Sequence, residues 1–299
     1  MSVLLNEHSR VLVVGATGRF GRQTLDDMRA AGTNVVAGVA YKSVADADPD
    51  LPLFPSVSAA IADTGANAAI VFVPAVRAMD SLLETLEAGL ELVVYPGEGL
   101  PVLDAITARH AALANGTVYV GANTPGLITP GVAKLGFMPT DCYLPGDVGI
   151  ISRSGSLSYE AASALTAAGI GQSTAIGIGG DPIRGLKAGE AIALFHDDPD
   201  TRAVVYLGEI GGDAEYEIAE YAARPDAKPV VAHIVGRTAP EGKQMGHAAA
   251  LVGSHRDTWE AKVDALELAG VDVPKSMREL PSAVLRAGDF AASPATMSL

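Results

Sequence analysis

The sequence is poor in cysteine and aromatic residues and lacks long apolar runs, features that are common in disulfide-bonded extracellular proteins and in membrane proteins. It holds one cysteine in 299 residues, Cys142, so no disulfide can form within the chain. Phe, Trp and Tyr make up only 5% of the residues, and no apolar run approaches the roughly 20 residues that cross a bilayer. The N-terminus, MSVLLNEHSR, lacks the basic start and long apolar stretch of a signal peptide. We therefore expect a soluble cytoplasmic protein.

Positive charge is also scarce. Lys and Arg number 21 against 35 Asp and Glu, which gives a formal net charge of -14. Nucleic acid and anionic membranes are therefore poor partners, and an anionic ligand has to be held by local devices such as helix N-termini. The 6 histidines are scattered without close ligand spacing, so we expect no metal site.

The sequence is rich in short Val/Ile runs that alternate with Ala-rich helical stretches. The runs are continuously apolar, which predicts parallel strands buried on both faces and an α/β fold of doubly wound sheets. The predicted strands are Arg10–Val14, Asn34–Ala40, Ala69–Pro74, Leu92–Tyr95, Val118–Gly121, Val148–Ser152, Ser173–Ile178, Ala203–Leu207 and Pro229–Val235. Ala75–Ala88 and Ser158–Ala168 have helical spacing.

A break in this pattern predicts two domains. The segment PTDCYLPG, Pro139–Gly146, contains two prolines and a glycine between the two series of strands. We place one domain at residues 1–143 and the other at residues 144–290. Residues 291–299 are small and polar, and we expect this tail to fray.

A glycine-rich turn follows the first predicted strand. In VLVVGATGRFGR, the residues Gly15, Thr17 and Gly18 separate a strand from a helix, which is typical of a dinucleotide-type phosphate site; the alternative is only a tight turn. The second strand ends with Lys42 instead of the acid that grips the ribose of NAD. A cation there suits the ribose phosphate of NADP or coenzyme A; the alternative is a solvated lysine. No hydride-transfer constellation accompanies the turn.

A second anion site is predicted at the start of a later helix. The stretch VGIISRSGSLSYEAASAL reads as a strand, a Ser/Gly turn and a helix. Ser154, Gly155 and Ser156 would offer backbone N–H groups and hydroxyls there. The alternative is simple N-capping by one of the serines, which is compatible with an anion site.

One histidine lies on a loop of small residues, KQMGHAAALVGS, and is the candidate nucleophile. His247 can converge with Glu209, which follows a predicted strand in VVYLGEIGGDAE, and with the serine-rich helix start. A carboxylate bonded to one ring nitrogen fixes the tautomer and leaves the other nitrogen nucleophilic. The alternative is an incidental loop histidine.

Taken together, these motifs resemble the alpha subunits of succinyl-CoA synthetase, among the ADP- or GDP-forming acyl-CoA synthetases. The likeness runs from residue 1 to about residue 288. It is carried in order by GATG, FVPA, EGLP, GANTPGLITPG, SRSGSLSYE, GQSTAIGIGGDPI, GEIGG and TAPEGKQMGHA.

The resemblance implies a Rossmann-like CoA-binding domain, followed by a flavodoxin-like domain in which His247 becomes a phosphohistidine oriented by Glu209. It implies that Ser154, Gly155 and Ser156 hold the phosphate. The implied CoA residues are Gly15, Thr17, Gly18, Arg19, Phe20, Lys42, Ser43, Val73, Pro74, Pro96, Gly97 and Glu98. The implied substrate residues are Asn123, Thr124, Pro125, Gly126 and Tyr159. No metal ligand is implied in this chain.

The resemblance also implies a second chain. A beta subunit of ATP-grasp fold would bind ATP/ADP or GTP/GDP and Mg²⁺, which agrees with the lack of a G-x-x-x-x-G-K-[ST] loop here. The implied function is that of an acid–thiol ligase, most directly succinate–CoA ligase, which acts through an acyl phosphate and a phosphohistidine. The implied assembly is a heterodimer or heterotetramer.

Several positions depart from the family pattern. A glycine loop that wraps CoA is replaced by AYKSVADADPD, and a usual Asn-Cys-Pro reads Asn123-Thr124-Pro125. These departures leave open a paralogous ligase with a different acid or acyl acceptor. A non-catalytic CoA-responsive module is a further alternative.

Overall fold

The computed structural model describes residues 3–40 and 50–288, and these form two compact units. One unit contains residues 4–138 together with 177–186, and the other contains residues 139–176 and 187–288. The chain passes between them at Met138 and Pro139, the start of the proline-containing segment, and residues 177–186 then return to the first unit. Lys42, Ser43 and the predicted tail 291–299 lie outside the described residues.

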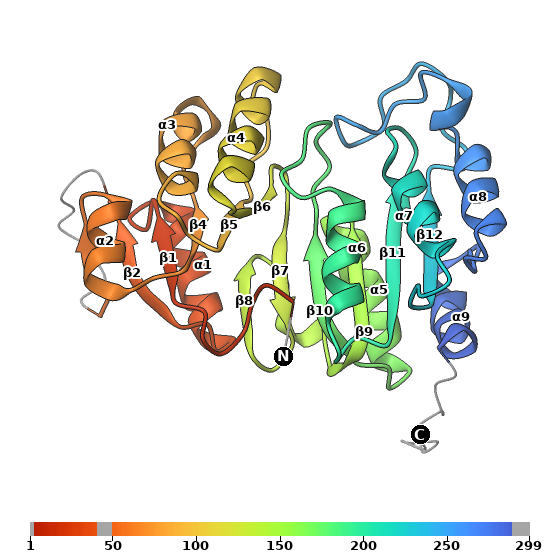
Figure 1. The fold of residues 1–299 in the computed structure, drawn as a ribbon, viewed down its shortest axis with the longest axis horizontal. Helices are drawn as coiled ribbons and strands as arrows, with labels where there is room; N and C mark the ends of the chain where they lie inside the picture. The colour runs from red at the N-terminus through yellow and green to blue at the C-terminus, as the bar shows by residue number, and fades with distance from the viewer. Residues whose placement is uncertain (1–2, 41–49, 289–299) are drawn as a thin grey trace. The chain divides into compact units, whose positions relative to one another are not determined.

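The first unit is built on a six-stranded sheet of order β3-β2-β1-β4-β5-β6 (Figure 1). All its strand pairs are parallel. This is the strand order of a Rossmann fold, so the predicted class of the first domain is confirmed. The strands are β1 (Val11–Val14), β2 (Val35–Val39), β3 (Leu53–Phe54), β4 (Ala68–Val71), β5 (Leu92–Tyr95) and β6 (Val118–Gly121).

The helices of the first unit bury faces of small and apolar residues against this sheet. They are α1 (Arg19–Ala30), α2 (Val57–Thr64), α3 (Ala75–Leu86) and α4 (Val102–Asn115), and α3 packs beside α4. In α4 the buried residues Ala105, Ala108 and Ala112 recur at helical spacing. The helix ends at Gly116, whose φ of 68° is the left-handed conformation that favours glycine.

Two short features of the first unit were not predicted. One is β3, which has only two residues. The other is an antiparallel hairpin formed by β7 (Gly126–Thr129) and β8 (Ala133–Gly136). Its strands have four residues each, too few for a periodic pattern to stand out.

The second unit contains strands in the order β12-β11-β9-β10, and β11 pairs in parallel with both β12 and β9. Numbered 1 to 4 along the chain and read from the β10 edge, these strands have the order 2-1-3-4. This is the order of doubly wound, flavodoxin-like folds, so the predicted class of the second domain is confirmed too. The strands are β9 (Pro145–Ser152), β10 (Gln172–Gly177), β11 (Ala203–Glu209) and β12 (Val230–Val235). The prediction placed Glu209 beyond a strand, whereas Glu209 is the last residue of β11.

Five α-helices accompany these strands in the described part of the second unit. They are α5 (Gly155–Ala167), α6 (Ala188–Asp197), α7 (Ala214–Ala222), α8 (Trp259–Leu268) and α9 (Leu280–Ala287). The structure begins α5 three residues before the predicted helix, at Gly155. Its buried residues Ala161, Ala162 and Leu165 lie along one face.

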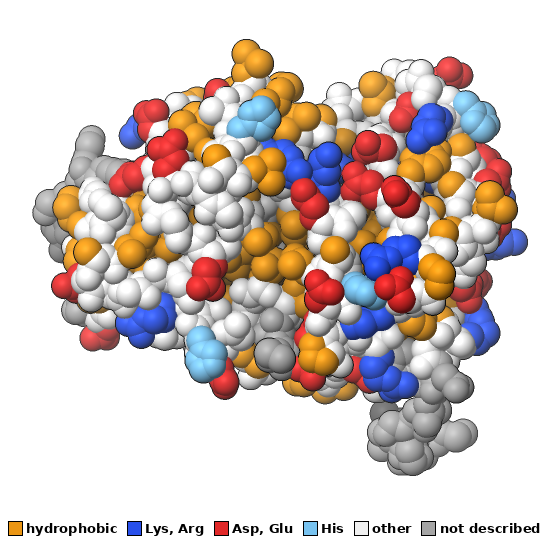
Figure 2. All heavy atoms as spheres, in the orientation of Figure 1, with side chains coloured by type: hydrophobic (Ala, Val, Ile, Leu, Met, Phe, Trp, Pro, Cys, Tyr) orange, Lys and Arg blue, Asp and Glu red, His pale blue; other side chains and the backbone are white. Residues whose placement is uncertain are grey.

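The distribution of charged side chains on the surface agrees with the acidic composition of the chain. On the face drawn in Figure 2, basic side chains stand among acidic ones instead of forming a continuous basic surface. Within residues 3–40 and 50–288, no helix has the length and apolar character needed to cross a membrane.

Candidate active site

The first glycine turn brings two segments of the first unit into close contact. Gly15 directly follows β1 and has φ of +82°, and a Cβ atom there would lie 2.5 Å from the carbonyl oxygen of Phe72. The N–H of Gly18 donates to the Gly15 carbonyl oxygen at 3.0 Å, and Gly18 is the N-cap of α1. No side chain caps this helix start. Its first N–H groups therefore point into the turn, where an anion would be stabilised.

A hollow of about 440 Å³ lies next to this turn. Six of the predicted CoA residues line it, and β4 and β5 end at it, as expected for a ligand site at the carboxyl ends of parallel strands. Val71, Phe72 and Phe137 complete the lining, and the sequence had not assigned them. The six predicted residues are Phe20, Val73, Pro74, Pro96, Gly97 and Glu98.

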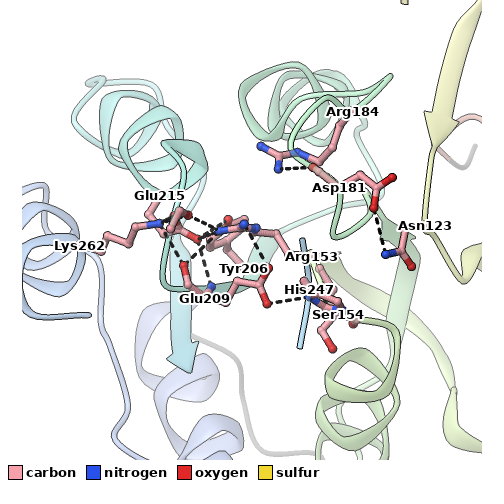
Figure 3. A network of polar contacts seen from close by, with 12 residues as sticks. Asn123, Arg153, Ser154, Asp181, Arg184, Tyr206, Glu209, Glu215, His247 and Lys262 are labelled. Atoms are coloured by element: carbon pink, nitrogen blue, oxygen red, sulfur yellow. Dashed lines mark hydrogen bonds and ion pairs between the residues drawn. The ribbon is translucent and has the colours of Figure 1, made fainter. Parts of the chain in front are cut away.

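The predicted substrate loop, residues 123–126, is held by residues 177–186 of the same unit. Asn123 has a positive φ of 57°, and its Nδ2 donates to Asp181 Oδ1 at 3.1 Å (Figure 3). The buried hydroxyl of Thr124 donates to the Gly177 carbonyl oxygen and accepts the Gly126 N–H at 2.9 Å. These bonds link Gly177 and Asp181 to the loop. Tyr159, the other predicted substrate residue, lies half-buried on α5 of the second unit.

In the second unit, the structure brings His247 and Glu209 together. His247 Nδ1 lies 2.8 Å from Glu209 Oε2 (Figure 3). The side chain of Glu209 is 8% exposed, and that of His247 is 27% exposed. A carboxylate can only accept here, so Nδ1 carries the hydrogen in this bond and the neutral ring has its lone pair on Nε2. The imidazole ring is therefore partly exposed and is held at Nδ1 by a buried carboxylate.

The loop that carries His247 is anchored more firmly than its small residues suggested. Met245 N–H donates to the Ala250 carbonyl oxygen at 2.8 Å, and Ala250 N–H donates to that of His247 at 3.1 Å. Ala250 packs with Ile210 and Val252 in a small buried cluster. Ala250 is therefore a core residue of this loop, because its side chain is only 2% exposed.

The start of α5 keeps its backbone donors available. Ser154 is the N-cap, and no side chain caps the helix. Ser152 Oγ accepts the Ser154 N–H at 3.1 Å, while the hydroxyls of Ser154 and Ser156 lie 3.4 Å apart. Simple side-chain capping, the alternative weighed from the sequence, is not what these serines do. The first turn of the helix can therefore bind an anion.

Behind Glu209 lies a buried group of charges that sequence reasoning missed. Arg153, Glu215 and Lys262 have side chains with 0% exposure, and Arg153 Nη2 lies 3.1 Å from Glu209 Oε1. Burial opposes ionisation of Glu215, but the charges of Arg153 and Lys262 lower its pKa below the ordinary value. Burial lowers the pKa of the Lys262 ammonium. Lysine and glutamate on helices are usually exposed, so no sequence signal marked these two residues.

No group of three or more His, Cys, Asp or Glu side chains within the described ranges could hold a metal ion.

Comparison with known proteins assigns both halves of the chain. Residues 6–99 match the family model of the CoA binding domain, and residues 151–271 match that of CoA-ligase. The alpha subunit of ADP-forming succinate–CoA ligase from Aquifex aeolicus is 45% identical over 96% of this chain and 95% of its own length. An alpha subunit of the same name from Staphylococcus aureus is 41% identical over 96% and 95%.

Solved structures share the fold at lower identity. ATP citrate lyase from Methanothrix soehngenii, solved with citrate and coenzyme A, has a TM-score of 0.86 at 24% identity, covering 96% of this chain and 50% of that one. A dinucleotide-forming acetyl-coenzyme A synthetase from Ca. Korarchaeum cryptofilum has a TM-score of 0.73 at 23% identity, covering 90% and 58%. With the near full-length relatives above, the chain belongs to the family of succinate–CoA ligase alpha subunits.

Proposed function

We propose that this protein is the catalytic alpha subunit of an ADP- or GDP-forming succinate–CoA ligase, in which His247 carries the phosphoryl group. Residues 1–143 would bind CoA and residues 144–290 would carry the phosphohistidine. The observation that supports this most directly is the 2.8 Å contact between His247 Nδ1 and Glu209 Oε2. The reaction would join a carboxylic acid and CoA at the expense of a nucleoside triphosphate, through an acyl phosphate and a phosphohistidine.

The His247–Glu209 pair would act as follows. The Nε2 lone pair attacks phosphorus, the N–P bond forms, and the P–O bond to the leaving nucleotide or acyl carboxylate breaks. The ring then bears a positive charge, with its hydrogen still on Nδ1. The buried Glu209 carboxylate offsets this charge and holds the ring plane, so no proton needs to leave during the attack.

The start of α5 would hold the transferred group. Ser154, Gly155 and Ser156 offer the N–H groups of an uncapped helix turn and two hydroxyls. Donors fixed before the reaction stabilise the charge on phosphoryl oxygens without reorganising. Arg153 directly precedes Ser154 and contacts Glu209, so the helix start is tied to the carboxylate that orients His247.

The first unit would bind CoA, which supplies the thiol that accepts the acyl group. Gly15, Thr17, Gly18 and Arg19 form a turn in which the backbone approaches closely and an uncapped helix begins, which fits a phosphate of CoA. The hollow lined by Phe20, Val73, Pro74, Pro96, Gly97 and Glu98 fits the less polar parts of the molecule. We assign the carboxylic acid to Asn123, Thr124, Pro125 and Gly126 of this unit.

The nucleotide and Mg²⁺ would come from a beta subunit of ATP-grasp fold. The relatives are named alpha subunits, which supports a partner chain, and the sequence of this chain lacks a Walker-type loop. Comparing succinate with other acids in the reconstituted complex identifies the acid. The segment that follows β2 in the sequence departs from the family pattern. Calorimetric titration with CoA tests whether the protein still binds CoA as the acyl acceptor.

Labelling of His247 tests the central step. The chain is purified with its beta subunit and incubated with ATP labelled at the γ-phosphate, and acid-labile, base-stable label is measured. His247→Asn should abolish the label, whereas the same change at His110, an exposed residue of α4, should not. Unchanged labelling of the His247→Asn variant would refute the assignment.

A further inference from the structure

Two buried cations converge on the end of β11, the strand that carries Glu209. Arg153 Nη1 donates to the carbonyl oxygens of Glu209 at 3.1 Å and Gly211 at 2.8 Å. Lys262 Nζ donates to the same two oxygens, at 3.0 Å and 2.6 Å. Arg153 directly follows β9 and Lys262 lies on α8, so the backbone after β11 is held from two separate parts of the unit.

Glu215 completes this cluster. Its Oε1 accepts from Tyr206 Oη at 2.9 Å and lies 3.4 Å from Arg153 Nη1, while Oε2 bonds to Lys262 Nζ. With Glu209, the cluster contains two cations and two carboxylates. Buried charges are tolerated when they are paired in this way, and each pair also fixes the geometry of its members.

The two cations differ in one respect. Arg153 has a second terminal nitrogen, and its Nη2 lies 3.1 Å from Oε1 of the Glu209 carboxylate, an ion pair between two buried atoms that do not have hydrogen-bond geometry. Lys262 Nζ instead bonds to the main-chain carbonyl oxygens of Glu209 and Gly211 and to the Glu215 carboxylate. The Glu209 carboxylate is therefore held between Arg153 on one oxygen and His247 on the other (Figure 3).

We propose that Arg153 is a positioning residue for phosphoryl transfer: it acts through Glu209, whose carboxylate it holds in the orientation that presents Oε2 to His247. The inference rests on the proposed function of His247. Both ends of Arg153 serve the same site, since its guanidinium holds Glu209 and its main chain leads directly into Ser154, the N-cap of α5.

Substitution of Arg153 should slow labelling of His247 in the complex with the beta subunit. Arg153→Met removes the contact with Glu209, and we expect a single-turnover rate lower by about 10- to 100-fold, the range seen when the carboxylate partners of metal-bound histidines are lost. Arg153→Lys keeps the charge but has only one terminal nitrogen. Compared with Arg153→Met, it should therefore restore more of the thermal stability than of the labelling rate. Affinity for CoA should stay within about twofold, because the predicted CoA residues lie in the other unit.

Lys262→Met is the matched comparison. It removes a buried cation from the same cluster and shares the Glu209 and Gly211 carbonyl acceptors, but it leaves the carboxylate contact of Arg153 in place. We expect a loss of thermal stability similar to that of Arg153→Met, with a rate reduced by about threefold or less.

A double-mutant cycle separates positioning from structural support. In a Glu209→Gln background, Arg153→Met should add little further slowing, because the two changes interrupt one chain of contacts. The proposal would be overturned if Arg153→Met slowed His247 labelling equally in the unsubstituted protein and in the Glu209→Gln variant. It would also be overturned if the Arg153 and Lys262 variants lost labelling rate in the same proportion to their loss of stability. If the unsubstituted complex is not labelled at His247, the proposed function fails instead.

Discussion

Gly211 lies directly against Ala249, so the turn after Glu209 and the loop of His247 are in backbone contact. A Cβ atom on Gly211 would overlap the Ala249 carbonyl oxygen and lie 2.7 Å from the Leu251 amide nitrogen. Gly211 also has φ of +77°, the left-handed region. The spacing between these two segments sets where His247 stands relative to Glu209.

Gly211→Ala should therefore displace the histidine loop. We expect a loss of about 1–3 kcal/mol in the free energy of unfolding, together with slower His247 labelling. Gly212→Ala is a matched control, since Gly212 has φ of +67° but its Cβ would meet only Arg153 Nη2, at 3.9 Å. Equal labelling rates for the two variants would show that the backbone contact does not position His247.

Glu215→Gln should make the protein less stable and change how stability depends on pH. The pKa of Glu215 is lowered in the folded state, because Arg153 and Lys262 outweigh the effect of burial. The stabilisation is present above the ordinary carboxyl pKa of about 4.3 and is lost as pH falls through the folded value. At pH 7 we expect a loss of about 3–5 kcal/mol, since a buried pair is broken.

The measurement is urea unfolding between pH 7 and the acid limit of folding. The difference between the unsubstituted protein and the Glu215→Gln variant should narrow as pH falls. Glu220→Gln, an exposed position on the same helix, should change stability by less than about 0.5 kcal/mol. A difference that stays constant down to the acid limit would contradict the ionised, paired state of Glu215.

Phe20→Ala should weaken CoA binding without weakening the fold. The Phe20 side chain is 68% exposed at the edge of the hollow, so a bound molecule would cover it. We expect about a tenfold loss of affinity by calorimetry, since covering an aromatic side chain is worth ~1.5 kcal/mol or more. Leu268→Ala removes a side chain that is 92% exposed in the other unit and should leave affinity unchanged. Equal affinity in both variants would place CoA elsewhere.

Thr124→Val should loosen the predicted substrate loop. The hydroxyl is buried and bonds both Gly177 and Gly126, so its replacement removes one hydrogen bond from each of two backbone groups. We expect a loss of about 1–3 kcal/mol in stability and a higher KM for the acid. Thr107→Val, which removes an exposed hydroxyl bonded to Leu103 within α4, is the control. If Thr124→Val changed neither the stability nor the KM for the acid, the loop would be held by other contacts.

The strands were predictable because each strand of a doubly wound sheet is buried on both faces and so reads as a continuous apolar run. Val11–Val14 and Ala203–Glu209 are buried throughout, and both were found within a residue or two of their ends. The β7/β8 hairpin was missed. Its pairing depends on Gly126 and Gly136 allowing close backbone approach, a property of the folded chain that four-residue strands do not reveal.

The sequence by itself determined the fold class, the family and the candidate pair His247 and Glu209, because apolar runs, glycine turns and ordered motifs are local features of the chain. Only the tertiary structure decided which charges stand behind that pair. Arg153, Glu215 and Lys262 come from three separate elements and meet at 0% exposure. Neither their burial nor their pairing is local: each charge is tolerated there because folding brings its partners within bonding distance.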